Sequence, residues 1–287
     1  MSTFTTAASI DDAIAALAAG ARPIAGGTDL VVGARSGKST LPDSIVAIHR
    51  IAALRGVEVT AYGSLWLGAL ATHAQIVGLG ECHARFTALT DACAIVGSHA
   101  TRAQGTIGGN VMNASPAMET GGPLICLDAT ATLGSPTGSR SLPIDEIWTG
   151  PGTTATDADE LLVAIEIPSP AVGTGSAYLR LEYRRQMEIA VVGATAAVTV
   201  SDGAVTAARI AMTALSPTIR RVPEAEAALV GSDGGAAAIA AAAAAVSAAA
   251  TPISDVRGSA DYRRAMAVVI ATRTIEKALA RATGADA

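Results

Sequence analysis

The sequence predicts an α+β fold in two parts: an N-terminal portion of roughly 170 residues and a C-terminal α+β portion of about 110, both near typical domain sizes. Short strand patterns alternate with short helical patterns as far as residue 168. The stretch 169–176 follows Pro168, contains Pro170 and has no periodicity, which marks a boundary. Beyond it, alternating residues on both sides of Asp202-Gly203 predict a β-hairpin, and most of the remainder is helical.

The N-terminal portion opens with a predicted helix that begins after Ser9 and ends at Gly20. Ser9 and Asp12, three residues apart, have the pattern of an N-cap. Residues 22–27, "RPIAGG", are expected to form a strand that runs into a glycine turn. Further strands are expected at 44–51 and 65–71.

The next elements follow in order along the chain. Thr72 is expected to cap a helix that begins at His73, and residues 85–97 predict a second helix. Residues 129–135 and 139–144 predict a hairpin, and residues 161–168 predict the last strand of this portion. After the C-terminal hairpin, helices are expected on both sides of a turn at 251–259.

The composition excludes several classes of protein. Half of the 287 residues are hydrophobic, so a sizeable core is available, while a net charge of −5 argues against nucleic-acid binding. The three cysteines form no C-x-x-C pair, which fits reduced thiols and supplies neither disulfides nor an iron–sulfur ligand set. Because the sequence has no basic leader and no apolar run suited to spanning a bilayer, we expect a soluble cytoplasmic protein.

Familiar nucleotide and catalytic motifs are incomplete. The stretch "GARSGKST" (33–40) looks like a P-loop, but three residues instead of four separate its glycines, so a solvated surface loop is favoured. The stretch "GLGECH" (78–83) lacks the third Rossmann glycine. The histidines have no metal-ligand spacing, and His73 and His99 are expected to be structural. An enzyme with so little acid–base machinery would depend on a cofactor for its chemistry.

Two glycine clusters are the main local signals. The stretches "PIAGGTDL" (23–30) and "GTIGGN" (105–110) each present consecutive backbone N–H groups that can surround anionic oxygens. The two clusters could bind the two phosphates of one dinucleotide from opposite sides. They could equally be unrelated glycine turns, and their spacing alone does not decide between these alternatives.

These clusters belong to a longer series of blocks: "PIAGGTDL", "GTIGGN", "ASPA", "ELLVAIEIP", "RRQMEIAVVGA" and "ISDVRGSADYR". In this order and spacing the blocks resemble the FAD-binding medium subunit of the molybdenum hydroxylases. That family includes carbon monoxide dehydrogenase, xanthine dehydrogenase and several bacterial N-heterocycle hydroxylases. The resemblance runs from about residue 4 to about residue 282.

The resemblance implies a fold in three parts. A two-subdomain FAD-binding fold of the vanillyl-alcohol oxidase-like type is expected, with subdomains at residues 1–54 and 55–172. A C-terminal α+β domain with an antiparallel sheet is expected at residues 173–287. The two-part division inferred from the residues alone has the same boundary near residue 170. It does not include the further boundary near residue 54 that the resemblance implies.

The resemblance also implies which residues bind the cofactor. The two glycine clusters match the two pyrophosphate loops of the family, and Leu162 matches a position that contacts FAD. The residues expected to bind FAD are Ala25, Gly26, Gly27, Thr28, Asp29, Leu30, Thr106, Ile107, Gly108, Gly109, Asn110, Glu119, Leu162 and Arg180. No residue is expected to act as a catalytic acid, base or nucleophile, and none is expected to bind a metal.

Three positions depart from the family pattern. Arg180 falls where many members have a lysine near the flavin, and it keeps the charge but not the geometry. Glu119 and Glu188 fall where aspartate is commoner, so one added methylene changes the reach of each carboxylate. Both glutamates could instead be ordinary solvated carboxylates.

By this resemblance the chain is an oxidoreductase subunit that passes electrons from iron–sulfur clusters through FAD to an external acceptor. Its expected partners are a small iron–sulfur subunit with [2Fe-2S] clusters and a large subunit with the molybdenum cofactor, in a dimer of heterotrimers. The alternatives are a self-sufficient flavin oxidase on the same fold and a flavin-free scaffold subunit. The intact glycines argue against the scaffold, because loss of the cofactor would remove the reason for them.

Overall fold

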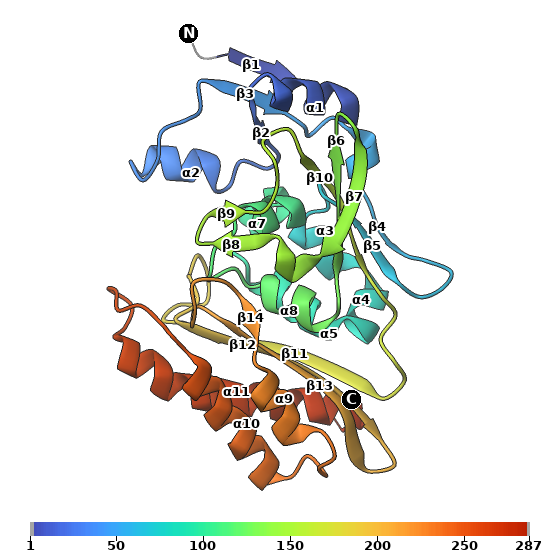
Figure 1. Cartoon of the computed structure of the whole chain (residues 1–287), viewed down its shortest axis with the longest axis vertical. Coiled ribbons are helices and arrows are strands. Elements are labelled where there is room, and N and C mark those ends of the chain that lie inside the picture. Colours follow the sequence, from blue (N-terminus) through green and yellow to red (C-terminus); the bar gives the residue numbers. More distant parts are fainter. Residues whose placement is uncertain (1–2, 286–287) are drawn as a thin grey trace.

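The computed structural model describes residues 3–285 and contains three main sheets, which follow one another along the chain (Figure 1). The first sheet is parallel and the other two are antiparallel. Short helices lie between the sheets, and three helices cover the C-terminal end of the molecule. The chain is therefore α+β, as predicted.

The N-terminal sheet has the strand order β1 (Thr3–Thr6), β3 (Ser44–Ala47) and β2 (Arg22–Ile24). α1 (Ile10–Ala18) connects β1 to β2 and buries one apolar face. The predicted cap is confirmed: Ser9 accepts a hydrogen bond from the Asp12 N–H, and the Asp12 carboxylate accepts one from the Ser9 N–H.

Residues 33–40 form no phosphate-binding loop. α2 (Leu30–Arg35) includes Gly33, and an exposed loop follows that carries Lys38. In a P-loop the glycines precede the helix, so that the N–H groups at the start of the helix surround the phosphate. Here the first of these glycines lies inside the helix, which excludes the P-loop.

The middle sheet has five antiparallel strands. From edge to edge they are β4 (Val57–Val59), β5 (Leu65–Gly68), β10 (Leu161–Ile167), β6 (Thr130–Ser135) and β7 (Gly138–Pro143). β6 and β7 form the predicted hairpin. β10 is the last of these strands in the chain yet central in the sheet, where it pairs with both β5 and β6.

That segment consists of short helices: α3 (His73–Gly78), α4 (Gly80–Arg85), α5 (Thr87–Ile95), α6 (His99–Gln104), α7 (Ile107–Met112) and α8 (Gly121–Cys126). Thr72 caps α3 as predicted. Apolar side chains of these helices, including Leu89, Ile107 and Leu124, pack with the sheet into the main buried cluster. Short elements complete this part: η1 (Ala52–Leu54), η2 (Ile144–Glu146), β8 (Trp148–Gly150) and β9 (Thr153–Thr154).

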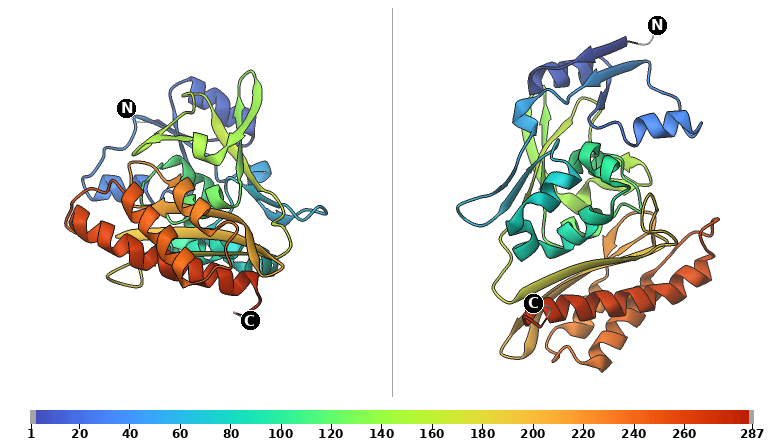
Figure 2. Two further views of the ribbon diagram at one scale, coloured as in Figure 1. Left: turned by 60° about the horizontal axis from the view of Figure 1, so that its bottom comes forward. Right: turned by 180° about the vertical axis from the view of Figure 1, so that it is seen from behind.

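The C-terminal sheet has the order β11 (Thr174–Leu181), β12 (Val192–Ser201), β13 (Ala204–Thr213) and β14 (Arg220–Arg221). The hairpin between β12 and β13 is confirmed, and its turn residues Asp202 and Gly203 both have positive φ (52° and 78°). α9 (Pro223–Leu229), α10 (Ala236–Ala249) and α11 (Ala260–Ala282) cover one face, while α5 and α8 pack on the other (Figure 2).

The sequence missed mainly short elements. β1, β4, β8, β9 and β14 have two to four residues, too few for an alternating pattern to stand out. α7 and α8 each contain a glycine pair, which lowers intrinsic helix propensity. The helix expected over 85–97 corresponds to α5, which begins after Phe86. Tertiary packing decides the structure at these places.

Asp91 on α5 forms hydrogen bonds that connect the C-terminal part of the chain to the helices of the middle part. Its carboxylate accepts hydrogen bonds from Arg281 (2.6 and 3.0 Å) and from Lys277 (3.4 Å), both on α11. The same carboxylate accepts a hydrogen bond from the N–H of Tyr178 on β11 (3.1 Å). One side chain therefore links α5, β11 and α11.

We expect Asp91→Ala to lower the free energy of unfolding by about 1–3 kcal/mol, because hydrogen bonds to a charged group would be lost at a half-buried junction. Urea denaturation of the isolated chain measures this change. The matched control is Asp261→Ala, since Asp261 is 96% exposed and pairs with Arg264 on the surface. That control should cost less than about 1 kcal/mol. Equal losses in the two variants would contradict the role given to Asp91.

Candidate functional site

The first glycine cluster forms the loop between β2 and α2. Gly27 has a positive φ of 71°, which a glycine adopts without strain. None of the N–H groups of residues 26–29 donates a hydrogen bond to another residue in the described chain. Unpaired backbone donors are uncommon in folded proteins, and residues 26–28 are half-buried. The loop therefore presents consecutive donors of the kind that bind anions.

The second cluster is built differently. It forms the N-terminus of α7, where Thr106 is the N-cap and accepts a hydrogen bond from the Gly109 N–H (3.0 Å). The N–H groups of Ile107 and Gly108 are bonded to the carbonyls of Ala71 and Ala69. The prediction of a second row of free N–H groups is therefore wrong, because these N–H groups already donate to other residues of the protein. What remains for a ligand is the N–H of Thr106 and the side-chain amide of Asn110, both without an acceptor in residues 3–285.

The fold brings the two clusters into contact. Asn113, just after α7, donates through Nδ2 to Oδ1 of Asp29 in the first loop (3.2 Å). Thr120 donates to Oδ1 of Asn110 (2.5 Å) and so fixes the orientation of that amide. Asn113 and Thr120 were not predicted as site residues, because neither belongs to a glycine cluster and no local pattern distinguishes them. Two segments about 80 residues apart thus form one polar surface, as the dinucleotide hypothesis requires.

The glycines are needed mainly because backbone packs on backbone. A Cβ added to Gly26 would overlap the Gln104 carbonyl, and one added to Gly108 would lie 2.6 Å from the Ala69 carbonyl oxygen. Gly109 differs: a Cβ there would meet only the Thr106 hydroxyl, at 3.0 Å. Gly26 and Gly108 therefore allow the loops to approach their neighbours, and Gly109 leaves the surface of α7 open on its exposed side.

Glu119 and Arg180, the two departures from the family pattern, contact each other. Arg180 on β11 donates through Nη1 to Glu119, which lies just before α8, and the side chains are 1% and 9% exposed. Arg180 also donates through Nε to Glu182 (2.7 Å) and through Nη1 to the Glu188 carbonyl (3.2 Å). The ion pair therefore joins the C-terminal sheet to the segment that follows the second glycine cluster.

The electrostatics of this pair follow from its burial. Loss of solvent raises the pKa of Glu119 to about 7, although the Arg180 guanidinium partly offsets the shift and Asp29 adds to it. Desolvation also raises the pKa of Asp29, although its surface remains partly open to solvent. Glu188 is not simply solvated either, because its carboxylate lies 3.5 Å from Arg184 and 3.9 Å from Arg257.

The remaining predicted residues lie around this surface. Leu30 begins α2 directly after the first loop and is half-buried. Leu162 on β10 is 3% exposed, and Ile107 is fully buried in the same apolar cluster. Ala25 is half-buried and follows β2. The side chains of Leu162 and Ile107 thus support the loops from inside the core.

Of the two histidines expected to be structural, only His73 is buried and hydrogen-bonded. His73 is 1% exposed, its Nδ1 lies 3.5 Å from the Cys93 sulfur, and burial lowers its pKa to about 4. His99 is exposed at the start of α6. Within residues 3–285 no group of three or more His, Cys, Asp or Glu side chains could hold a metal ion. No described helix combines the length and apolar character that a membrane crossing requires.

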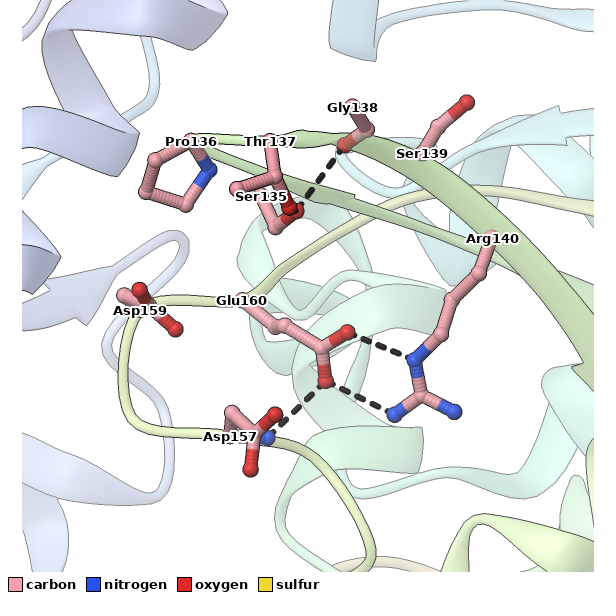
Figure 3. A pocket seen from close by; sticks show the side chains of 9 residues that line it. All are labelled: Ser135, Pro136, Thr137, Gly138, Ser139, Arg140, Asp157, Asp159 and Glu160. Carbon is pink, nitrogen blue, oxygen red and sulfur yellow. Dashed lines mark hydrogen bonds and ion pairs between the residues drawn. The ribbon is translucent and has the colours of Figure 1, made fainter.

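A pocket of about 360 Å³ lies elsewhere, beside the β6–β7 turn (Figure 3). Its acidic side chains include Glu160, which accepts two hydrogen bonds from Arg140 (2.6 and 2.8 Å) and one from the Asp157 N–H (2.9 Å). The Arg140 hydrogen bond lowers the pKa of Glu160. Because the carboxylate is already satisfied and carries its own counter-charge, this pocket does not resemble a cation site.

Comparison with known proteins shows the family of the chain. Residues 1–170 match the family model described as "FAD binding domain in molybdopterin dehydrogenase", and residues 177–278 match the "CO dehydrogenase flavoprotein C-terminal domain". The chain belongs to the FAD-binding medium subunits of the molybdenum hydroxylases. It is 33% identical over 277 residues to the carbon monoxide dehydrogenase medium chain of Afipia carboxidovorans, covering 96% of this chain and 95% of that one.

Other medium subunits show the same relationship. The xanthine dehydrogenase FAD-binding subunit of Escherichia coli O157:H7 is 29% identical over 281 residues, covering 97% of this chain and 96% of its own. A solved carbon monoxide dehydrogenase from Hydrogenophaga pseudoflava superposes with a TM-score of 0.93 at 31% identity, and 97% of each chain is covered. Quinoline 2-oxidoreductase from Pseudomonas putida 86 gives 0.90 at 29% identity, with 99% and 98% covered. The expected fold of FAD-binding medium subunits is thereby confirmed.

The residues present fit FAD. A diphosphate needs several hydrogen-bond donors in place of water, and the free N–H groups of residues 26–29 supply them without a lysine. The N–H of Thr106 and the amide of Asn110 add donors from the other side. The family match makes the chain a flavoprotein subunit of an oxidoreductase family, and the free donors at the two glycine clusters are compatible with FAD.

Two adjacent glycines give a matched test of this site. We expect Gly108→Ala to lower the free energy of unfolding by about 1–3 kcal/mol, since its methyl group would collide with backbone that cannot move aside. Gly109→Ala should leave stability within about 1 kcal/mol, because the helix gains an alanine and meets only the Thr106 hydroxyl.

Flavin content separates packing from binding in the same pair. Gly109→Ala should reduce the FAD bound per chain, measured by absorbance after gel filtration, although the apoprotein remains stable. Gly78→Ala is the control, since nothing lies within 4 Å of its added carbon. Full flavin content in Gly109→Ala would remove Gly109 from the cofactor surface.

The Glu119 carboxylate predicts a pH dependence. Its folded pKa of about 7 lies above the ordinary value of 4.5, so folding favours the protonated form. This contribution to stability is complete below pH 4.5 and is lost as the pH rises toward 7, in total by roughly 3 kcal/mol. In Glu119→Gln, the unfolding midpoint of the apoprotein should change less with pH between these two values. The exposed Glu58→Gln is the control, and an unchanged slope in Glu119→Gln would contradict the assignment.

Proposed function

We propose that the chain is the electron-transfer subunit of a heterotrimeric molybdenum hydroxylase. It receives electrons from iron–sulfur clusters of a small partner subunit and passes them by way of FAD to an external acceptor. A large partner subunit carries the molybdenum cofactor and hydroxylates the substrate. The observation that supports this best is the row of free N–H groups at residues 26–29, held against the second glycine cluster.

In this proposal bound FAD supplies the redox chemistry, and the residues of the chain bind, orient and shield it. Residues 25–30 hold one side of the diphosphate, and residues 106–110 hold the other. Arg180 fixes the position of the Glu119 carboxyl group, which would form a hydrogen bond with the cofactor. Leu162 supports the site from β10. No side chain needs to act as an acid, base or nucleophile.

The proposed partners follow from the names of the relatives, which are described as medium chains and subunits. We propose a dimer of heterotrimers from the family resemblance, and a cytoplasmic location because all three cysteines are buried free thiols. We also propose a division into units at residues 1–54, 55–172 and 173–287. The change from one sheet to the next near each boundary supports this division.

The complex purified through a tag on this chain tests the function. We expect one FAD per copy of the chain, together with iron–sulfur absorption from copurified subunits. Removal of the FAD should leave reduction of the iron–sulfur clusters by substrate intact and should lower reduction of the external acceptor at least about tenfold, that is by about 1.4 kcal/mol or more. Re-addition of FAD is the control and should restore it.

Two outcomes would contradict the proposal. A flavoprotein without an iron–sulfur partner that turns over substrate by itself would favour the self-sufficient oxidase. A complex that contains iron–sulfur clusters and no flavin, even after reconstitution with FAD, would favour a scaffold.

A further inference from the structure

The face of the C-terminal sheet that packs against α5 and α8 carries a row of buried polar side chains (Figure 1). Tyr178 on β11 lies opposite Thr195 on β12. Gly193 on β12 has Arg180 of β11 on one side and Thr213 of β13 on the other. Because residues directly opposite each other, or two apart on one strand, share a face, these side chains lie together. We call Tyr178, Arg180, Thr195 and Thr213 the polar strip; each is at most 9% exposed.

The polar atoms of this strip lack hydrogen-bond partners. Within residues 3–285, five buried side-chain nitrogen or oxygen atoms have no such partner, and four belong to the strip: the hydroxyl oxygens of Tyr178, Thr195 and Thr213, and Nη2 of Arg180. That nitrogen lies 2.6 Å from a Glu182 oxygen, but the contact does not have hydrogen-bond geometry. Buried polar groups are nearly always hydrogen-bonded, because an unpaired one has lost its contacts with solvent without compensation. Four such atoms in one place therefore indicate a shared partner.

Two glycines show that the hydroxyl groups converge. A Cβ added to Gly122 on α8 would lie 2.4 Å from Oγ1 of Thr195 and 3.5 Å from Oγ1 of Thr213. A Cβ added to Gly193 would lie 2.9 Å from the Tyr178 hydroxyl oxygen and 3.0 Å from Cβ of Thr213. Oxygen atoms this close to a common point are within reach of one small molecule that forms hydrogen bonds of about 2.8 Å. The glycines keep other side chains away from the hydroxyl groups.

The strip also borders the buried ion pair of the glycine surface. Burial raises the pKa of the Tyr178 phenol and the Glu119 charge raises it further, whereas the Arg180 charge and the nearby Thr213 hydroxyl oppose the rise. These influences require Tyr178 to lie close to both members of the pair. A molecule bound at the strip would therefore lie beside the guanidinium that contacts Glu119.

Water fits the strip better than an ion does. An anion would meet the carboxylates of Glu119 and Glu182, which already pair with Arg180, and a cation would meet the guanidinium. Hydroxyl groups both donate and accept hydrogen bonds, as water does. A buried water molecule typically forms about three hydrogen bonds to polar groups that are otherwise unpaired, and the strip offers four such atoms.

We infer that the polar strip binds ordered water between α8 and the C-terminal sheet, and that this water completes the hydrogen bonds of Arg180 and of the three hydroxyl groups. With water bound, hydrogen bonds continue from Thr213 on β13 to Arg180 on β11, so the sheet helps Glu119 to fix the guanidinium. The inference does not depend on the proposed function, because it concerns only groups that are buried within this chain.

Diffraction from crystals of the full chain, alone or in its complex, tests the inference directly. We expect electron density for at least one water molecule at about 2.6–3.2 Å from two or more of the four unpaired atoms. Water at other buried sites in the same map is the control. A strip without water in a map that shows those other waters would overturn the inference. Direct hydrogen bonds among the three hydroxyl groups in place of water would overturn it too.

Thr213→Val tests the inference in solution, because bound water and a dry strip predict opposite signs. Valine keeps the shape of threonine and removes only the hydroxyl group. If that hydroxyl binds water, its loss leaves the water and its other partners with one hydrogen bond fewer, so the thermal midpoint should fall by at least about 2 °C. In a dry strip the same change removes an unpaired buried polar group, and the midpoint should rise. An unchanged or raised midpoint would overturn the inference.

Double variants show whether the water is shared. The fall in midpoint for Thr195→Val combined with Thr213→Val should be smaller than the sum of the two single falls, because the same water is lost only once. Thr274→Val combined with Thr213→Val is the matched control and should be additive. Thr274 is equally buried on α11, and its hydroxyl already donates to the Ile270 carbonyl oxygen (2.7 Å). Additive falls in both pairs would contradict a shared water and overturn the inference.

Discussion

The structure depends on the contact between the two glycine clusters. At Gly26 the first loop touches the backbone of Gln104, just before the second cluster, and no side chain fits between them. The hydrogen bond from Asn113 to Asp29 fixes the same contact from the other side. The loop that follows the N-terminal sheet and the helices between β5 and β6 thus meet at the place where the free N–H groups of residues 26–29 are presented. Backbone geometry at this point sets the shape of the proposed cofactor surface.

The two clusters divide the work unequally. The first offers a row of free backbone donors, as a short loop before a helix can do. The second uses its N–H groups to join α7 to the segment after β5, and it leaves the Thr106 N–H and the Asn110 amide as donors for a ligand. In the proposed function, such a surface would bind a diphosphate without a lysine, because the donors are fixed before the ligand arrives and lose little entropy on binding.

The C-terminal domain takes part in the site through one buried ion pair. Arg180 on β11 contacts Glu119, which follows the second cluster in the chain. Asp91 on α5 separately forms hydrogen bonds with β11 and α11. Breaking a buried pair leaves a charge in an apolar setting, which is costly, so the pair fixes the register between the two parts of the molecule.

The sequence by itself determined the elements whose signals are local. The capped helix at Ser9, the helix after Thr72, the hairpin at Asp202-Gly203 and the glycine turn after β2 all follow from a few neighbouring residues. The six ordered blocks were enough to recognise the family, because their order and spacing are unlikely to recur by chance. Which residues contact FAD stays a prediction.

Only the tertiary structure decided how distant residues pair. Nothing local shows that the N–H groups of Ile107 and Gly108 are bonded to Ala71 and Ala69, or that Glu119 meets Arg180, 61 residues away. The roles of Asn113 and Thr120 have the same origin. A residue pattern specifies what a segment can form by itself, whereas contacts between segments depend on how the three sheets pack.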